Sequence, residues 1–268
     1  MLKDQMSMMI LSCDKFSDLW EGHIKLLEQN WPDRGMKTFL VTDCPSEISF
    51  DHVSVIAAGS DMEWSERLGY ALEYIETEYV FVTLDDYFLI KPVSTPQIED
   101  ILTMMDKEKF DYLRLYLRPK CPRSAKMPEY GEVYRIDTSI NYSVNLYAGI
   151  WRKSFLVQTI RTPKNAWRYE VSLPKIATEV GAKCAMSNNR EFVILDVVRK
   201  GKLLHRAANY FKMHDIYHGN RPVIGRWYEI KLGIRTWCVR LMPRKITEIA
   251  RSLMIRLGHH YYSQDADT

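Results

Sequence analysis

The strongest constraint on the fold of this 268-residue chain is an apolar run that ends in two adjacent carboxylates. Residues 79–84 are aromatic, β-branched or aliphatic, which is typical of a buried strand, and Asp85 and Asp86 follow directly. In open α/β sheets, ligands bind beyond the carboxyl ends of the strands. Carboxylates at that edge can hold a divalent cation that in turn holds substrate phosphates. The alternative is a strand end with two solvated acids and no metal.

Strand patterns alternate with helix patterns along the chain, which predicts a mainly parallel sheet with helices on its faces. Apolar runs predict strands at residues 8–14, 38–43, 53–56, 79–84, 111–117, 144–149 and 192–195. Apolar residues at helical spacing predict helices at residues 19–29, 64–77, 98–105 and 154–160. A further helix is expected after residues 167–170, and Pro174 could interrupt it.

Two local patterns predict where elements begin and where a long loop lies. Ser60 and Glu63 have the spacing of a capping box, which predicts a helix start at that point. Residues 118–134 contain Pro119, Pro122 and Pro128 among charged residues, which predicts a long loop. Long loops in compact domains are often functional.

Composition narrows the cellular setting. The five cysteines are scattered, none forms a Cys-x-x-Cys pair, and the odd count fits a reducing compartment. Residues 1–11 contain Lys3 and Asp4 and lack the apolar core of a signal peptide. The longest uncharged run, residues 138–151, is too short and too polar to span a bilayer. We therefore expect a cytoplasmic protein.

Charge is unevenly distributed along the chain. Residues 199–268 carry 14 Lys and Arg against 5 Asp and Glu, whereas residues 1–198 carry 23 against 29. A basic tail on an acidic body predicts an anionic partner. Within residues 226–256, basic side chains alternate with Trp, Ile and Leu, a pattern that suits an interfacial membrane position. The alternative is a helix packed on the domain with a solvated basic face. We find no signature of a nucleic-acid-binding fold, and we expect no nucleic-acid partner.

The residues before and after the acidic pair resemble a known family. A helix that carries Arg67 and Gly69 leads into the strand and the two aspartates. This order is similar to that of nucleotide-sugar glycosyltransferases of the GT-A fold, whose Asp-x-Asp-type motif ends a strand. Residues 10–14, 64–68 and 84–89 resemble bacterial members associated with surface polysaccharides such as capsule and lipopolysaccharide.

The resemblance extends over roughly residues 8–200 and implies an overall architecture. It implies a GT-A-like single α/β domain over residues 1–225, with a mainly parallel (mixed) central sheet flanked by helices. A basic, amphipathic helical segment would follow at residues 226–268.

The resemblance also implies a metal site. Asp86 would bind Mn²⁺ or Mg²⁺, and Asp85 beside it would contact the ribose or the metal. Such a cation would clamp the donor diphosphate and offset charge on the leaving group. This sequence has Asp-Asp-Tyr in place of Asp-x-Asp, which admits water-mediated or single-carboxylate binding. A late histidine often joins the metal in this family; His205 is the first candidate, ahead of His214 and His218, and a structural role stays open for each.

Four residues are candidates for the donor site by the same resemblance. Ser12 and Asp14 would lie near the base and ribose, although Asp14 could instead cap the following helix. Arg67 would reach the base or the diphosphate as a cation, or lie solvated on its helix. Gly149 falls in a segment similar to the glycine-containing loop that lines the donor sugar and acceptor, and a plain turn is the alternative.

Glu170 is the candidate catalytic base. It lies where inverting members carry an acid that deprotonates the acceptor hydroxyl, a task that requires hydrogen-bond reach. The alternative is a surface acid in a first helical turn, where acids are favoured anyway. Trp167 and Tyr147 are the candidate acceptor-binding residues.

Together these observations predict a metal-assisted glycosyltransferase. The donor would be a nucleotide-diphosphate sugar, and the acceptor a hydroxyl of a surface glycan or a lipid-linked glycan at the inner face of the plasma membrane. Two alternatives stay open. One is a non-catalytic membrane- or polysaccharide-binding protein on a degenerate transferase fold. The other is a sugar nucleotidyltransferase, although residues 10–20 contain no glycine and so lack its usual Gly-rich loop.

Overall fold

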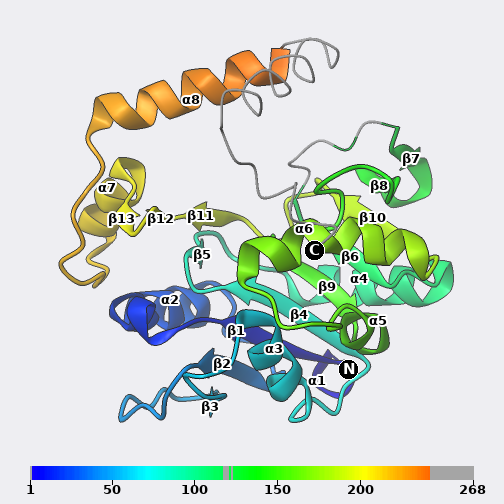
Figure 1. Cartoon of the computed structure of the whole chain (residues 1–268), viewed down its shortest axis with the longest axis horizontal. Helices are drawn as coiled ribbons and strands as arrows, with labels where there is room; N and C mark the ends of the chain where they lie inside the picture. The colour runs from blue at the N-terminus through cyan, green and yellow to red at the C-terminus, as the bar shows by residue number, and fades with distance from the viewer. Residues whose placement is uncertain (1, 117–120, 122, 242–268) are drawn as a thin grey trace.

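The computed structural model describes residues 2–116, 121 and 123–241, and a large mixed β-sheet lies at its centre (Figure 1). Within this described part, nine strands form the sheet. They are β1 (Met6–Leu11), β2 (Thr38–Thr42), β3 (Val53–Ala57), β4 (Tyr79–Leu84), β6 (Tyr112–Arg114), β7 (Ala125–Met127), β8 (Val133–Arg135), β9 (Gly149–Arg152) and β10 (Cys184–Ser187). Their order across the sheet is β3-β2-β1-β4-β9-β6-β10-β8-β7.

Strand directions confirm the mainly parallel, mixed sheet. β1 pairs in parallel with both β2 and β4, β2 pairs in parallel with β3, and β6 pairs in parallel with β10. β9 runs antiparallel between β4 and β6, and the β7–β8 hairpin extends one edge. Because parallel strands end at the same edge of a sheet, the residues that follow β1, β2 and β4 come together there.

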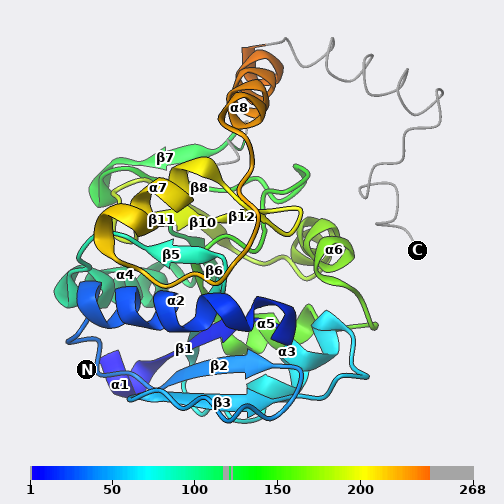
Figure 2. The same ribbon diagram turned by 90° about the vertical axis from the view of Figure 1, so that its left-hand side faces the viewer.

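Helices cover both faces of the sheet (Figure 2). One face carries α1 (Leu2–Gln5), α2 (Ser17–Asn30) and α4 (Thr95–Glu108). The other carries α3 (Trp64–Leu72), α5 (Lys153–Gln158) and α6 (Ala166–Glu179). Short 3₁₀ turns, η1 (Asp14–Phe16) and η2 (Pro128–Tyr130), precede α2 and β8.

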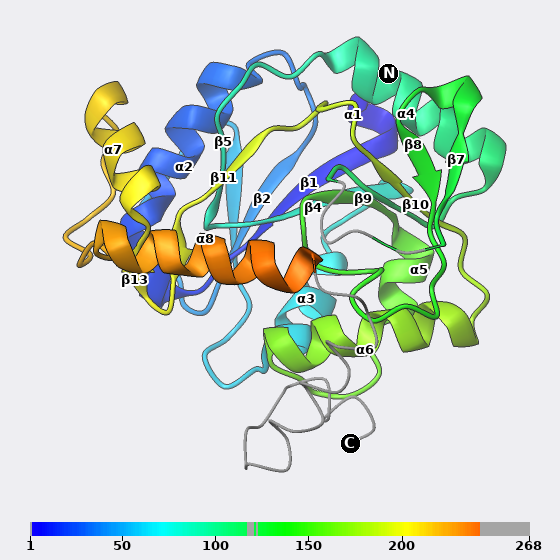
Figure 3. The ribbon, with the colours of Figure 1, turned by 90° about the horizontal axis from the view of Figure 1, so that it is seen from above.

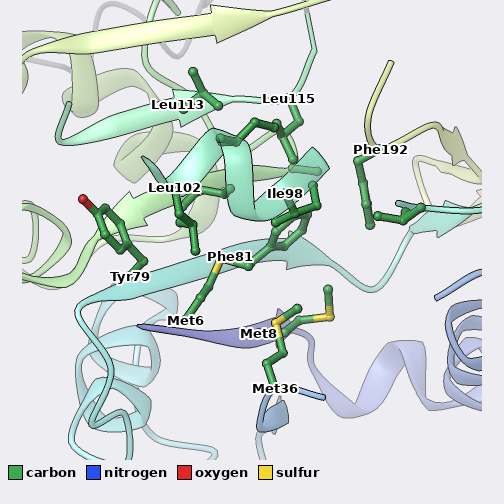
Figure 4. Close-up of a cluster of buried hydrophobic side chains, with 14 of the residues drawn as sticks. Met6, Met8, Met36, Tyr79, Phe81, Ile98, Leu102, Leu113, Leu115 and Phe192 are labelled. Carbon is green, nitrogen blue, oxygen red and sulfur yellow. The ribbon is translucent and has the colours of Figure 1, made fainter. Parts of the chain in front are cut away.

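The central strands are buried on both faces, which explains their continuous apolar sequences. Met6, Met8 and Phe81 point into the core beneath α2 and α4 (Figure 4). Their neighbours Met9 and Val82 point into the core beneath α3, α5 and α6. The period of two along each strand thus divides the apolar residues between two cores.

A smaller layer lies beyond the carboxyl ends of the strands (Figure 3). β5 (Tyr87–Leu89) pairs antiparallel with β11 (Ile194–Asp196), and the β12 (Val198–Arg199) and β13 (Lys202–Leu203) hairpin leads to α7 (His205–His214). Phe88, Val197 and Phe211 form its core with Leu19 of α2. Two nitrogens of Arg221 donate to the carboxylate of Asp18 at 2.8 and 2.7 Å, which fastens the segment after α7 to α2.

The last described element is α8 (Arg226–Leu241), which starts at the first residue of the expected basic segment. None of the described helices combines the length and the apolar character that crossing a membrane requires. Residues 242–256 of the expected interfacial segment lie outside the described residues.

Several local expectations need correction. The helix after Ser60 starts at Trp64, because the side chain of Glu66 accepts a hydrogen bond from Glu63 N at 2.8 Å and thereby fixes the start there. Pro174 does not interrupt α6, because buried residues on both sides of it hold the helix in the core.

Two expected segments are also shifted. The strand expected at residues 144–149 is wrong for residues 144–148, because the strand in this region, β9, begins only at Gly149. β9 is buried on both faces, so its sequence has no alternating pattern that marks where it starts. The predicted loop 118–134 includes β7, η2 and the start of β8 as well as residues outside the described part.

Candidate functional site

Asp85 is held tightly at the carboxyl end of β4. Its backbone N donates to Leu11 O at 3.3 Å, and Ser12 Oγ donates to its carboxylate. Trp20 Nε1 in turn donates to Ser12 Oγ at 2.6 Å. Burial raises the pKa of Asp85 to about 7, although the bond from Ser12 opposes this rise. Ser12 and Asp85, each predicted separately to contact the donor, therefore meet, but as a buried hydrogen-bonded unit.

His23 supports the same strand end from α2. Burial lowers its pKa to about 4, so the ring is neutral near neutral pH. Its Nδ1 lies 3.1 Å from the carbonyl oxygen of Asp85, and the neutral ring can donate a hydrogen bond there. The backbone around Asp85 is thus fixed from β1 and α2 together.

Asp86 is different, because its Oδ1 is buried without a hydrogen-bond partner among the described residues. Burial, followed by the charges of Asp85 and Asp196, raises the pKa of Asp86 well above its ordinary value. Asp196 reaches this place because β11 sets it opposite Tyr87. An orphaned carboxylate oxygen next to a second carboxylate is an arrangement that a divalent cation would stabilise.

The donor set for such a cation is small. In the described chain, no three His, Cys, Asp or Glu side chains gather in a way that could hold a metal. Mg²⁺ commonly binds through one or two protein carboxylates together with substrate phosphates, so Asp86 and Asp196 fit this mode. His205 is the first residue of α7 and is partly exposed; its role as a ligand stays a prediction.

Asp14, Asp43 and Arg67 form a polar network at the ends of β1 and β2. The backbone N of Asp14 donates to Asp43 Oδ2 at 3.2 Å, and Asp43 N donates to Asp14 Oδ1 at 3.2 Å. Arg67, on α3, forms an ion pair with Asp43. Asp14 and Arg67, both predicted to contact the nucleotide, are therefore brought together through Asp43, which the sequence analysis did not single out.

A cavity of about 280 Å³ opens beside this network. Asp14, Ser17, Trp20 and residues 44–48 line it. Its place, beyond the carboxyl ends of two parallel strands, is where α/β sheets bind nucleotides. The aromatic ring and the polar groups of its lining suit a planar, polar base.

Glu170 lies on α6, and its charge, like that of Asp86, acts on Tyr87. Leu146 N donates to Glu170 Oε1 at 3.2 Å. Burial raises the pKa of Glu170, while the bond from Leu146 and the positive charge of Arg114 oppose the rise. Arg114 is fully buried in β6 and donates to the carbonyls of Tyr142 and Ser143 at 3.4 Å each. A partly buried acid with a raised pKa is a recurring form of general base.

Three tyrosine rings, those of Tyr87, Tyr147 and Tyr116, stack on one another near the acidic residues. The ring centres of Tyr87 and Tyr147 are 5.3 Å apart with planes 4° from parallel, and Tyr116 stacks on Tyr147 at 5.2 Å. Burial raises the pKa of Tyr87, and so do the charges of Asp86, Asp196 and Glu170. The charges of these three carboxylates therefore all act on one ring of the aromatic stack.

The remaining predicted residues lie near this site or at its margin. Trp167 is 61% exposed at the start of α6. Gly149 is buried at the start of β9, where an added Cβ would lie 2.9 Å from Leu113 O. The structure thus gives Gly149 a packing role between strands, and its contact with a donor stays a prediction.

The fold has known counterparts among solved structures. S. aureus TarS 1–349 in complex with UDP-GlcNAc matches with a TM-score of 0.50 and 16% identity, over 74% of this chain and 60% of that chain. Mannosyltransferase PcManGT from Pyrobaculum calidifontis, in complex with GDP-Man and Mn²⁺, gives 0.48 and 10% over 74% and 58%. CMP:2-keto-3-deoxy-manno-octonic acid synthetase with CTP gives 0.43 and 12% over 79% and 97%.

Sequence comparison adds no relative: neither a family model nor a curated protein matches the chain. At 16% identity the TarS match bears on the fold alone, and it supports the architecture described above. The chain has the GT-A-like α/β fold. It spans 60% of the TarS 1–349 chain.

Proposed function

We propose that this protein is a glycosyltransferase that moves a sugar from a nucleotide-diphosphate donor to a hydroxyl group of a surface glycan or a lipid-linked glycan. The observation that carries the proposal is the partnerless buried oxygen of Asp86, set beside Asp196 at the carboxyl end of β4. The cavity beside Asp14 and Trp20 would supply a site for the base, and the partly buried Glu170 on α6 would supply an acid with a raised pKa. Transfer from a sugar nucleotide needs these three parts: a base site, a cation site and a general base.

The cavity beside Asp14 and Trp20 would hold the base. Arg67 is already neutralised by Asp43, so it would orient that carboxylate toward the ribose more than bind phosphate. Asp86 and Asp196 would hold Mn²⁺ or Mg²⁺, which when bound would offset the charge that develops on the leaving diphosphate. The Mn²⁺ in PcManGT belongs to that protein, and its use here is part of the proposal.

Glu170 would act as the base if the reaction inverts configuration. The acceptor hydroxyl oxygen forms a bond to the anomeric carbon while the bond from that carbon to the diphosphate oxygen breaks. The hydroxyl proton passes to Glu170, and the bonding electrons leave with the nucleoside diphosphate. Burial raises the pKa of Glu170 toward the pH at which it must accept this proton.

The tyrosine stack would receive the acceptor. Tyr87, Tyr116 and Tyr147 present aromatic rings next to Glu170, and aromatic faces pack against the apolar face of a sugar ring. Trp167, exposed one turn before Glu170, would extend this surface toward the rest of the glycan.

Calorimetric titration of nucleotides tests the proposal. UDP, GDP, CDP, ADP and CMP are titrated with and without Mn²⁺ into the wild type, Asp86→Asn and the exposed control Asp33→Asn. We expect one nucleoside diphosphate to bind only with Mn²⁺, and Asp86→Asn to weaken that binding at least about 100-fold. If Asp86→Asn bound the nucleotide with Mn²⁺ as tightly as the wild type, the metal-binding role of Asp86 would be contradicted. If the wild type bound none of these nucleotides, the proposal of a glycosyltransferase would be contradicted.

A turnover assay separates the proposal from a nucleotidyltransferase. The enzyme is incubated with the sugar nucleotide of the base that binds, and release of nucleoside diphosphate is measured. A parallel reaction contains the nucleoside triphosphate with the sugar phosphate, and release of pyrophosphate is measured. Diphosphate release supports the glycosyltransferase, whereas pyrophosphate release alone would overturn it.

A further inference from the structure

Large apolar side chains are unusually exposed near the end of the described chain. Trp227 is 78% exposed and Ile234 is 55% exposed, and both lie on α8. Half of the strongly exposed large apolar residues of the described chain fall between positions 213 and 234: Met213, Tyr217, Val223, Trp227, Tyr228, Ile230 and Ile234. A concentration of exposed apolar side chains in one segment is a reason to look there for an interaction site.

The exposed residues of α8 form a stripe with basic flanks. Trp227, Ile230 and Ile234 are three and four positions apart, so they lie on one face of the helix. Arg226 and Lys231 are also exposed, and their positions fall on either side of that face. A stripe of Trp and Ile between basic residues has the chemistry of an interfacial helix.

No element of the described part of the chain covers this stripe. α8 lies apart from the sheet and its covering helices, and two views at right angles agree on this (Figures 1 and 2). Its polar side is attached instead: Arg206 N donates to Glu229 Oε2 at 3.3 Å, and Arg206 Nε lies 3.7 Å from Glu229 Oε1. Glu229 is thus tied to α7 while Trp227, Ile230 and Ile234 face away from any described partner.

We propose that the Trp227, Ile230 and Ile234 face of α8 binds an anionic lipid surface, with the apolar side chains inserted among the headgroups and Arg226 and Lys231 against lipid phosphates. Charge complementarity selects this partner: residues 199–268 carry 14 basic against 5 acidic residues, and the described apolar face lies within that segment. An apolar groove of another protein would bury the stripe but would offer no anionic group to Arg226 and Lys231. An anionic lipid surface would bind both the apolar stripe and these two cations.

Vesicle co-sedimentation with the full chain tests the proposal without donor or metal, so the result is independent of the transferase activity. The vesicles are phosphatidylethanolamine with phosphatidylglycerol, or phosphatidylcholine alone. We expect the wild type to sediment with the anionic vesicles and to stay in the supernatant with the neutral ones. The double variant Ile230→Ser with Ile234→Ser should weaken binding at least about tenfold. Arg226→Gln with Lys231→Gln should weaken it at low salt and less at high salt, because salt screens exposed charges.

Matched controls keep the outcome decisive. Val157→Ser changes an exposed apolar residue on α5, and Lys91→Gln removes an exposed cation before α4. Both should bind vesicles like the wild type. If the Ile230→Ser, Ile234→Ser double variant bound anionic vesicles as well as the wild type, insertion of the apolar side chains would be overturned. The same conclusion would follow if only the Arg226→Gln, Lys231→Gln variant lost vesicle binding. Failure of the wild type to bind anionic vesicles, or stronger binding to RNA than to vesicles, would overturn the membrane partner.

Discussion

The hydroxyl of Ser12 donates a hydrogen bond to the carboxylate of Asp85, which joins the ends of β1 and β4 across the base of the candidate site. Trp20 Nε1 donates to the same hydroxyl, so Ser12 cannot turn away without leaving a buried donor unpaired. The two adjacent aspartates therefore differ in their contacts. Asp85 is hydrogen-bonded within the protein, whereas Asp86 Oδ1 is buried without a hydrogen-bond partner among the described residues.

This division predicts how stability depends on pH. The pKa of an aspartate in an unfolded chain is about 3.9. Burial raises the pKa of Asp85 in the folded protein to about 7. The folded chain therefore holds an extra proton between these values, and its stability falls as pH rises through that window. As pH rises from about 4 to about 8, the free energy of unfolding should fall less for Asp85→Asn than for the wild type. The difference between the two falls should be up to a few kcal/mol.

Thermal unfolding across pH checks this prediction. The melting temperature of Asp85→Asn should fall less steeply than that of the wild type, by several degrees over the window. Ser12→Ala removes a bond that lowers the pKa of Asp85, so its fall should extend to higher pH. Parallel pH profiles for the wild type and Asp85→Asn would contradict the raised pKa.

Asp196 and Arg199 should affect cation affinity in opposite directions. Arg199 Nη2 lies 3.3 Å from Asp196 Oδ2, and its charge also lowers the pKa of Asp86. Asp196→Asn removes a carboxylate from the proposed cation site and should weaken Mn²⁺ binding about 10- to 100-fold. Arg199→Gln removes a competing cation and should strengthen it. Mn²⁺ titration in the presence of the nucleotide measures both, and changes of the same sign would count against the assignment.

Glu170→Gln should remove the alkaline rise of the reaction rate. An ionised carboxylate is the active form of a general base, so wild-type turnover should increase with pH through the raised pKa of Glu170. The amide cannot accept the proton, and kcat should fall about 10²- to 10⁴-fold. Glu179→Gln is the matched control, because Glu179 is on the same helix but is exposed and paired with Arg161. A wild-type pH profile in Glu170→Gln would rule out the base.

Two glycines should respond oppositely to alanine. A Cβ on Gly149 would lie 2.9 Å from Leu113 O, and that backbone is fixed in the sheet, so Gly149→Ala should destabilise the fold by about 1–3 kcal/mol. A Cβ on Gly69, in α3, would meet only side-chain atoms of Ile160 at 3.5 Å or more. Gly69→Ala should stabilise by up to about 1 kcal/mol, because it improves helix propensity. Denaturant unfolding measures both, and destabilisation of similar size in each would refute the steric account.

The first half of the fold was accessible to sequence reasoning because its signals are local. The strands β1 to β4 are continuous apolar runs, and Asp85 and Asp86 follow one of them directly. The helix α3 was found from its apolar spacing, although its capping residues were placed one turn too early. The antiparallel insertion of β9 was not predicted, because a strand buried on both faces gives no alternating pattern to fix its ends.

The residues that were missed depend on contacts far apart in sequence. Asp196 ends a strand of three residues, and only its pairing with β5 brings it beside Asp86. Arg114 lies inside a predicted strand, and a charged residue in a strand is normally expected at the surface. In the structure it is fully buried near Glu170. Neither position carries a local motif that could have singled it out. A buried charge can be recognised only once its partners are known.

Arg206 connects Asp196, at the proposed cation site, to Glu229 on α8. Its side chain lies 3.8 Å from Asp196 Oδ2, and both its side chain and its backbone N contact Glu229 on α8. A ligand that draws the charge of Asp196 into its own coordination weakens the hold of that carboxylate on Arg206, and the guanidinium can then turn fully toward Glu229. Any such coupling would be reciprocal, so an interaction that moved α8 would change affinity at Asp196 by the same factor. Arg206 is the physical contact through which the proposed cation site would communicate with the last described helix.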